Sequence, residues 1–314
     1  MRRVITGRAP TTLIKGKVRS DIYDVLGTAN SGASRRGSTF WKSVTSCPRE
    51  HALTYIVGLQ PVYPGDPLVL GLAWHHVLDV YYRGMQAGAV NPAEAAFDVI
   101  DKLEDSADFR DMGHKLRAML TTYLDTYERS DKWRVIAVEE TLEYVGAFEY
   151  SARLDLIIED LVHGGLWAVE HKSANAVSSG LLDNYQLDLQ ILGQVWLLEH
   201  CVDLSKYPPF RGVRINIVTT GAVVPKCART EVLPSVEHLA AFERSVLGLN
   251  RLRGALEKLA WPQYLGHCAG YARGYGRCQY FDLCHDYPDR VVADWQDPAT
   301  EVPVTYTRKT QTKV

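Results

Sequence analysis

The sequence predicts an α/β fold in which a small mixed sheet is flanked by helices. Two observations predict it. Apolar residues recur at helical spacing in the first part of the chain, and short apolar runs bounded by turn residues follow them. A further helical segment then separates the third run from the next. Helices, three strands, a helix and a strand, in that order, are typical of an α/β domain.

Three helices are expected before the sheet. Apolar positions at helical spacing predict the first over residues 71–87. Asn91-Pro92 opens the second, because a capping residue followed by proline is favoured at the first turn of a helix. A third is expected over 111–129.

The strands are predicted from apolar runs, and Gly164-Gly165 marks a turn between two of them. The elements expected after the third helix are, in order, strands at 135–145, 148–158 and 166–171, a long amphipathic helix at 181–200, strands at 213–219 and near 226–233, and a helix at 235–259.

The composition is that of an ordinary globular protein. The 314 residues include 46% apolar and 23% charged residues, and the formal net charge is −2. This charge argues against a tight, sequence-independent DNA coat protein, although a protein that binds nucleic acid can still concentrate basic residues on one face. No signal peptide is expected, and no apolar stretch approaches the ~18 residues that span a bilayer. We therefore expect a cytoplasmic protein whose six cysteines are thiols or metal ligands.

Four segments are expected along the chain. Residues 1–70 form an N-terminal segment, in which the small polar residues of 27–39 predict a mobile loop. Residues 71–233 form the core, and 234–290 form a helix followed by a cysteine-containing loop. Residues 291–314 form a polar tail that we expect to be extended or frayed.

Asp155 and Glu170-His171-Lys172 are the candidate catalytic residues. Burying a carboxylate among the apolar residues of a strand is costly unless it has a partner. Glu170 and Lys172 leave their strand on one face, and a hairpin around 159–165 would bring Asp155 and Glu170 to one cation. Carboxylates suit Mg²⁺ or Mn²⁺, and the lysine can hold a phosphate or the attacking water. An edge-strand Asp with a solvated Glu–Lys pair is the alternative.

On these motifs the chain resembles the PD-(D/E)XK nuclease superfamily. In particular it is similar to the RecB-like exonuclease branch with a cysteine-bound iron–sulfur cluster, which includes CRISPR-associated and phage-encoded nucleases. The family has a strand Asp followed by (Asp/Glu)-x-Lys on the next strand, as Asp155 and Glu170-x-Lys172 are here. The resemblance implies a restriction-endonuclease-like αβββαβ core over about 71–219, with the N- and C-terminal segments joined by a metal cluster.

RecB-like members add a histidine on the upstream helix, in the setting Gly-x-x-x-His-x-x-Leu. Gly71, His75 and Leu78 match this setting. A lone helical histidine is more often structural, and the match is what favours a functional His75. The neighbouring His76 points about 100° away on a helix, so only one of the two can face the strands.

Two departures precede Asp155 on its strand. Leu154 stands where many superfamily members have proline, as is normal for the RecB-like branch, and Ala152 stands where many relatives have glycine. Members also carry a polar motif, usually a glutamine, on the helix after the lysine strand. Gln190 is the expected catalytic residue, with Tyr185 and Gln194 as alternatives.

The resemblance implies a role for each residue of the site. His75, Asp155, Glu170 and the carbonyl of His171 would hold Mn²⁺ or Mg²⁺, and the nitrogen ligand favours Mn²⁺. Lys172 would position the water that attacks the phosphorus and help to deprotonate it.

Cysteines lie on both sides of the core. Cys47 is upstream, and Cys268, Cys278 and Cys284 lie in a glycine-rich segment whose backbone freedom suits wrapping around an ion or a cluster. Relatives have one cysteine before the core and three after it, with the last two commonly spaced as Cys278 and Cys284 are. The resemblance implies that these four cysteines hold a [4Fe–4S] cluster.

Zinc is the alternative occupant, since four thiolates bind it equally well, and free thiols are a third interpretation. The spacing between Cys268 and Cys278 is wider than that of the usual relative. Cys201 and Cys227 are expected to be plain core or surface thiols.

A basic and aromatic stretch follows the core. It can bind a single strand through phosphate pairing and base stacking, although a solvated helix followed by a loop would have the same composition. Its residues are Arg251, Arg253, Lys258, Trp261, Tyr264, Tyr271, Arg273, Tyr275 and Arg277. Arg35 and Arg36 are a second basic candidate.

The expected function is that of a metal-dependent DNA exonuclease of a bacterial or phage-infected cell. It would act on single-stranded or end-bearing DNA in recombination, repair or CRISPR adaptation. The sequence has no Gly-x-x-x-x-Gly-Lys-(Ser/Thr) loop, so unwinding would need a helicase or another partner protein. A structure-specific endonuclease is one alternative. A non-catalytic DNA-binding or assembly subunit is another, but it would have no chemical reason to keep Asp155, Glu170 and Lys172 together.

Overall fold

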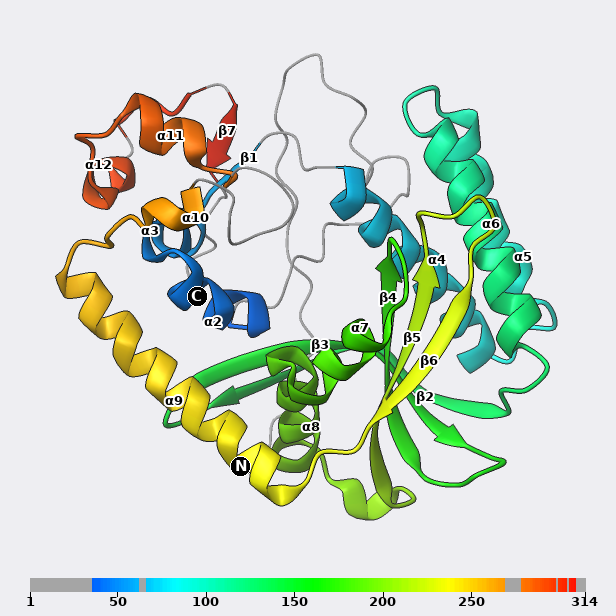
Figure 1. Cartoon of the computed structure of the whole chain (residues 1–314). Coiled ribbons are helices and arrows are strands. Elements are labelled where there is room, and N and C mark those ends of the chain that lie inside the picture. The colour runs from blue at the N-terminus through cyan, green and yellow to red at the C-terminus, as the bar shows by residue number, and fades with distance from the viewer. Residues whose placement is uncertain (1–35, 62–65, 269–277, 298, 304, 309–314) are drawn as a thin grey trace. The chain divides into compact units, whose positions relative to one another are not determined.

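The computed structural model describes residues 36–61, 66–268, 278–297, 299–303 and 305–308 (Figure 1). The chain divides into two compact units. Among the described residues, the first unit contains 66–144 and 150–240 and is called the sheet unit. The second contains 36–61, 145–149 and the residues from 241 onward, and is called the terminal unit.

The sheet unit is built on a five-stranded mixed sheet in the order β2-β3-β4-β5-β6, which confirms the predicted α/β class. β3 pairs antiparallel with β4, β4 parallel with β5, and β5 antiparallel with β6. The parallel pair is connected through helices, as parallel neighbours require. The strands are β2 (Trp133–Val145), β3 (Glu149–Asp160), β4 (Leu166–Ala174), β5 (Phe210–Thr219) and β6 (Cys227–Val232).

The turn between β3 and β4 depends on glycine. Gly164 and Gly165 have φ of 74° and 96°, a region that L side chains rarely adopt. A Cβ on Gly165 would also lie 2.5 Å from Cγ of Arg211. The turn leads into the register in which Leu156 pairs with Val169.

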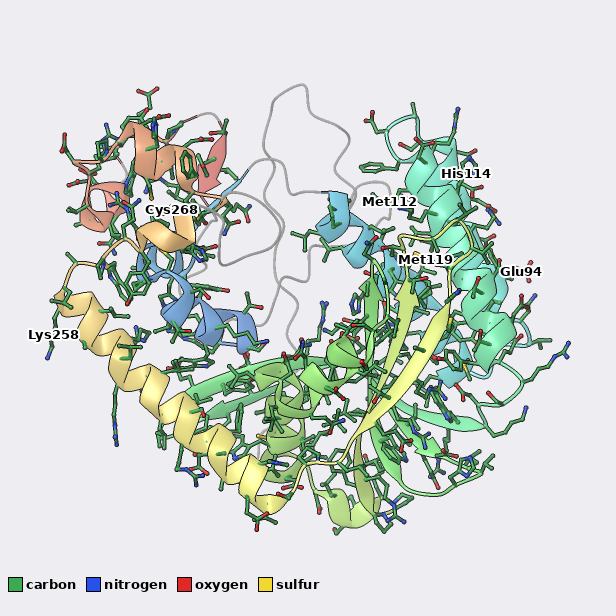
Figure 2. All side chains as sticks on the ribbon, in the orientation of Figure 1. Glu94, Met112, His114, Met119, Lys258 and Cys268 are labelled. Atoms are coloured by element: carbon green, nitrogen blue, oxygen red, sulfur yellow. The ribbon has the colours of Figure 1, made fainter. Side chains whose placement is uncertain are left out.

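Three helices precede the sheet, as predicted: α4 (Asp66–Gln86), α5 (Pro92–Asp105) and α6 (Arg110–Tyr127). Each is amphipathic: Met119 of α6 is fully buried, whereas Glu94 of α5 and His114 of α6 are exposed (Figure 2). One apolar core joins the helices to the sheet and includes Trp74, Leu78, Ile100, Leu120, Tyr123, Leu156, Trp167 and Val169. Full burial of a leucine or valine side chain stabilises a fold by about 1.5–3 kcal/mol, so this core anchors the strands that carry the candidate site.

The helix predicted over 181–200 is interrupted, so the prediction of one long helix was wrong. α7 (Ser179–Asn184) leads into a 3₁₀ turn, η2 (Tyr185–Leu187), and α8 (Leu189–Cys201) then begins anew. The side chain of Asp188 accepts the backbone N–H of Gln190 at 2.7 Å and so caps the new helix. The break places Gln190 in the first turn of α8. A second 3₁₀ turn, η3 (Leu204–Lys206), precedes β5.

The terminal unit joins segments from both ends of the described chain. β1 pairs antiparallel with β7, and the hydroxyl of Tyr280 donates to the carbonyl of Leu59 at 2.6 Å. Its elements are α2 (Ser38–Ser46), α3 (Pro48–Ala52), the π-helical turn η1 (Leu53–Val57), β1 (Leu59–Pro61), much of α9 (Val236–Lys258), α10 (Leu265–Cys268), α11 (Phe281–Asp286), α12 (Val292–Gln296) and β7 (Tyr306–Arg308).

The tail expected to be extended or frayed contains a short helix, α12, as well as the short strand β7. Trp295 is fully buried, and the hydroxyl of Tyr306 donates to the carbonyl of Gln279 at 2.8 Å, which ties the tail to the unit. Residues 27–35 of the expected mobile loop lie outside the described residues, and α2 begins at Ser38 within the expected loop.

Within the described part of the chain, no helix is both long enough and apolar enough to span a bilayer.

Candidate active site and cysteine centre

Asp155 and Glu170 lie on neighbouring strands of the sheet unit. Leu156 of β3 pairs with Val169 of β4, so Asp155 and Glu170 are the next residues along the two strands. The backbone N–H of His171 donates to Oδ2 of Asp155 at 2.8 Å. Both carboxylates are buried, with 7% and 1% of the residue exposed. The hairpin therefore brings together the two acidic residues that the sequence singled out.

His75 reaches Asp155 from α4, with Nδ1 3.3 Å from Oδ2. Burial alone would lower the pKa of the imidazole, but the carboxylate outweighs it and raises the pKa of His75 to about 9. Burial likewise opposes ionisation of Asp155, yet His75 and Lys172 hold the pKa of this carboxyl well below its usual range. Gly71 is not required sterically, since a Cβ there would make an ordinary contact of 3.9 Å with Oγ of Ser173.

Three side-chain donors hold the carboxylate of Glu170. Its Oε1 accepts from Nζ of Lys172 at 2.5 Å and from Nε2 of Gln190 at 2.6 Å, and its Oε2 accepts from Nε2 of Gln194 at 2.6 Å. Nζ of Lys172 also donates to Oε1 of Gln190 at 3.0 Å. Gln190 and its alternative Gln194 are one turn apart on α8, so both reach the site. The other alternative, Tyr185, also lies near Lys172, and this proximity contributes to the raised pKa of the ammonium group.

Successive side chains of β4 point to opposite faces. Glu170 and Lys172 meet α8, whereas the ring of His171 stacks on Tyr82 of α4, with centroids 5.4 Å apart, and meets Tyr123 of α6 edge-on. Burial opposes the charge of Lys172, but Glu170 raises the pKa of the ammonium group. Burial lowers the pKa of His171 to about 3, so its ring is neutral. Because this ring lies on the face of β4 opposite to Glu170, any contact of His171 with a metal beside Glu170 concerns its carbonyl rather than its ring.

Glu139 of β2 joins the site although it was not predicted. A ring nitrogen of His75 and one oxygen each of Glu139 and Asp155 lie within 4.8 Å of one another. Burial and the charge of Asp155 raise the pKa of Glu139 to about 7, against the opposing charge of Arg153, whose Nε lies 2.6 Å from Oε2 of Glu139. The one sequence signal is an acidic residue directly after the apolar run that ends at Val138.

The four predicted cluster cysteines all lie in the terminal unit and are buried, whereas the other two cysteines belong to the sheet unit. Cys47 precedes α3, Cys268 ends α10, Cys278 precedes α11 and Cys284 lies within it. Burial, together with Cys268 and Cys47, raises the pKa of Cys284 to about 11. These three thiols are therefore close enough to affect one another. The glycines expected to wrap the cluster, 270, 274 and 276, lie outside the described residues.

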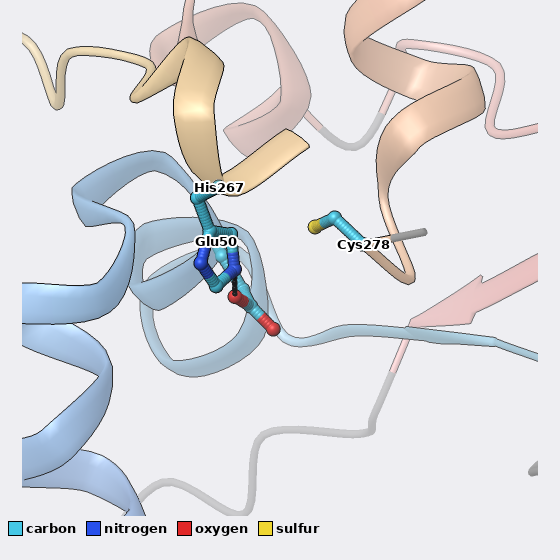
Figure 3. Close-up of side chains that lie close together, drawn as sticks. All are labelled: Glu50, His267 and Cys278. Carbon is cyan, nitrogen blue, oxygen red and sulfur yellow. Dashed lines mark hydrogen bonds and ion pairs between the residues drawn. The ribbon is translucent and has the colours of Figure 1, made fainter. Parts of the chain in front are cut away.

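Glu50 and His267 lie beside Cys278 (Figure 3). Nε2 of His267 is 2.7 Å from Oε2 of Glu50, and Nε2 of Gln279 donates to Oε1 of the same carboxylate at 3.1 Å. One ligand atom of each of Glu50, His267 and Cys278 lies within 4.8 Å of the other two. The four buried cysteines 47, 268, 278 and 284, called the cysteine centre, thus have beside Cys278 a carboxylate and an imidazole that the sequence did not single out.

The predicted nucleic-acid contacts are only partly described. Trp261 is 6% exposed and lies beside His51, with ring centroids 5.4 Å apart, so it is a core residue rather than a stacking platform. Tyr264 is 42% exposed. Arg36 pairs with Glu149 at 3.0 Å. Arg251, Arg253 and Lys258 lie on α9, and Arg35, Tyr271, Arg273, Tyr275 and Arg277 lie outside the described residues.

The sequence profile of the PD-(D/E)XK nuclease superfamily matches residues 41–285, and the chain belongs to this superfamily. No curated protein matches the chain. Among solved structures, it is similar to a candidate exonuclease from Eubacterium rectale, at 9% identity and a TM-score of 0.42 over 77% of this chain and 88% of that one. It is also similar to the protein SSO0001, at 15% identity and a TM-score of 0.31 over 67% and 84% of the two chains. Both TM-scores are low, so neither likeness supports an argument about activity.

Proposed function

We propose that this superfamily member is a metal-dependent DNA exonuclease of the RecB-like branch. The observation that supports the proposal most is the grouping of two buried carboxylates, Asp155 and Glu170, with Lys172 on one side and His75 on the other. Carboxylates that bind a divalent cation, next to a group that stabilises phosphoryl charge, are the requirements of metal-assisted phosphodiester hydrolysis.

His75, Asp155, Glu170 and the carbonyl of His171 would hold Mn²⁺ or Mg²⁺. The residues fit such an ion, because Asp155 is ionised and Nδ1 of His75 lies 3.3 Å from its Oδ2, so that the two ligand atoms are side by side. The nitrogen favours Mn²⁺. A bound cation would neutralise charge on the phosphoryl oxygens and lower the pKa of a water molecule.

Lys172 and the glutamines of α8 would orient the reacting groups. Because Lys172 is protonated, it acts through its charge and its hydrogen bonds, and it favours deprotonation of the water without itself accepting the proton. Gln190 and Gln194 fix the carboxylate of Glu170, and Gln190 also holds Nζ of Lys172. Such positioning lowers the entropic cost of reaching the reactive geometry.

Single-stranded or end-bearing DNA is the proposed substrate, in recombination, repair or CRISPR adaptation in the cytoplasm of a bacterial or phage-infected cell. A helicase or another partner protein would supply unwinding. The resemblance to RecB-like nucleases supports this part of the proposal, and the basic residues of α9 offer phosphate contacts.

The proposal includes a [4Fe–4S] cluster held by Cys47, Cys268, Cys278 and Cys284. Four buried thiols in one unit fit such a cluster, since burial disfavours a thiolate unless a cation binds it. Anaerobically purified protein should be brown and contain iron. A colourless preparation that contains zinc would replace the cluster with the alternative metal.

Degradation of end-labelled DNA tests the activity. The wild type and Lys172→Ala are incubated with linear single-stranded DNA, linear double-stranded DNA and a closed circle, each with Mn²⁺, Mg²⁺ or a chelator. We expect metal-dependent loss of linear DNA by the wild type alone. Cleavage of the closed circle would indicate an endonuclease, and no cleavage by folded protein would indicate a binding or assembly subunit.

A further inference from the structure

Glu50 of α3, His267 of α10 and Cys278 before α11 come together from three separate segments of the terminal unit (Figure 3). Each is buried, with 5% of the residue exposed. We infer that these three residues bind a single zinc ion when the cysteine centre carries no iron–sulfur cluster. Both states use Cys278, so they exclude one another. The inference is independent of the proposed nuclease activity, whose residues belong to the sheet unit.

The three side chains are of the types that zinc prefers. Zinc is bound by thiolate sulfur, imidazole nitrogen and carboxylate oxygen, and three such ligands with a water molecule complete a tetrahedral site. Their charges also suit a buried position, because the charges of one thiolate, one carboxylate and a divalent ion cancel. A zinc ion on four thiolates would instead carry a net negative charge, and burial of an uncompensated charge is costly.

The spacing of the cysteines argues against a single ion on four thiolates. Thiolates around one zinc ion lie about 3.8 Å apart, since each bond is about 2.3 Å long. Among the residues that the structure describes, no three of the cysteines 47, 268, 278 and 284 have sulfur atoms within 4.8 Å of one another. A four-iron cluster holds its thiolates further apart, so this spacing agrees with the proposed cluster. One ligand atom each of Glu50, His267 and Cys278 does meet the limit of 4.8 Å.

The contact between Glu50 and His267 is already close to the geometry of two ligands. Nε2 of His267 lies 2.7 Å from Oε2 of Glu50, and Gln279 holds the other carboxylate oxygen at 3.1 Å. A bound ion would displace the proton between nitrogen and oxygen to solvent, and the two atoms would separate to about 3.3 Å. The sulfur of Cys278 points towards this pair (Figure 3). The simpler interpretation is that Glu50 and His267 only join their segments by a hydrogen bond.

Cobalt substitution separates these interpretations without requiring activity. Full-length protein is produced in iron-depleted medium with Co²⁺, and its absorption spectrum is measured after unbound metal is removed. The sulfur-to-cobalt charge-transfer band reports the terminal unit alone, because the ligands proposed in the sheet unit contain no sulfur. We expect the spectrum of tetrahedral Co²⁺ with the band intensity of one cobalt–sulfur bond per chain.

Glu50→Gln tests the carboxylate as a ligand. The variant keeps a hydrogen-bond acceptor for His267 but loses the negative charge. It should weaken Co²⁺ binding at least about tenfold, measured by competition with a chelator. Glu301→Gln, which removes an exposed carboxylate of the same unit, is the matched control and should bind Co²⁺ as the wild type does.

Cys47→Ser distinguishes the site from four thiolates, because it should keep both the band and the affinity, whereas a four-thiolate site would lose a ligand. The wild-type spectrum decides the matter even if this variant does not fold. A wild-type band with the intensity of four cobalt–sulfur bonds, no band at all, or undiminished affinity in Glu50→Gln would overturn the inference. Iron content of anaerobically purified protein tests the proposed cluster separately, so either proposal can fail alone.

Discussion

The site around Glu170 and the cysteine centre differ in how well the surrounding protein stabilises their candidate metal ligands. Glu170 accepts hydrogen bonds from three side chains, so the chain itself fixes this carboxylate. In the terminal unit, burial raises the pKa of Cys284 to about 11, so the thiolate that a metal requires is disfavoured before an ion binds. The difference teaches that the hydrogen bonds of the sheet unit hold Glu170 in place without an ion, whereas the cysteines of the terminal unit would need a bound cation to favour their thiolates.

Lys172→Ala should cause the largest change, and it should change activity alone. Loss of the ammonium group removes charge stabilisation in a preorganised site, and we expect cleavage to fall about a thousandfold. Thermal unfolding should show a stable protein, because Lys172 lies at the site and outside the apolar core. Lys206→Ala, which removes an exposed lysine, is the control. Metal-dependent cleavage by Lys172→Ala at the wild-type rate would refute the site assignment.

Cys284→Ser should change stability and metal content instead. Where a site is not preformed, the free energy of metal binding contributes to folding, so losing a ligand should lower the melting temperature by roughly 10 °C. Iron analysis and calorimetry on anaerobic protein measure the two effects. Cys201→Ser, in the sheet unit, is the matched control and should keep its iron. If Cys284→Ser keeps both iron and stability, the cysteine centre is as preorganised as the other site.

His171→Phe should reduce the fall of the free energy of unfolding as the pH drops below 6.5. Burial lowers the pKa of folded His171 to about 3, against 6.5 for an unperturbed histidine. Below pH 6.5 the unfolded chain therefore binds a proton that the folded chain does not, and stability falls as the pH falls. The loss is about 1.4 kcal/mol per pH unit, or roughly 2 kcal/mol between pH 6.5 and 5.

Urea unfolding with a chelator present, at several pH values, measures this slope. The exposed His163 provides the control, since His163→Phe should keep the wild-type slope. If the free energy of unfolding of His171→Phe depends on pH as steeply as that of the wild type, the ring of His171 is not held neutral beside Tyr82 and Tyr123 in the wild type.

Gln190→Leu should have the smallest effect, about a tenfold loss of cleavage rate. The variant removes one of three donors to Glu170 and one contact of Lys172, and the remaining donors still hold the carboxylate. Gln186→Leu is the control, because Gln186 donates to the carbonyl of Glu231 instead. A loss as large as that of Lys172→Ala would show that the glutamine acts directly on the substrate.

The order of the elements was predictable because each depends on a local pattern. β4 and β5 are apolar runs since they are buried on both faces. The meeting of Asp155 and Glu170 was also predictable, because a tight turn at two glycines restricts the register of the hairpin. The break before α8 was not, since an aspartate in an amphipathic pattern resembles a solvated face until its hydrogen bond to Gln190 shows that it is a cap.

Non-local contacts account for the residues that sequence reasoning missed. Glu139 joins the site because β2 lies beside β3, and strand neighbours are not encoded in the spacing of one strand. Trp261 was grouped with solvent-facing aromatics, but it packs beside His51, which is far away in the chain. Glu50 and His267 meet for the same reason.

The hydrogen bonds that close the terminal unit also bear on its biosynthesis. Tyr280 and Leu59 are 221 residues apart, and Arg49 donates to the carbonyl of Arg290 across 241 residues. The entropic cost of such loops grows only with the logarithm of their length, so the separation itself is tolerable. A ribosome nevertheless releases Cys47 long before it makes the segment that contains Cys284. Domains generally fold as they emerge, so the sheet unit can form first, and the cysteine centre is assembled at the end of synthesis.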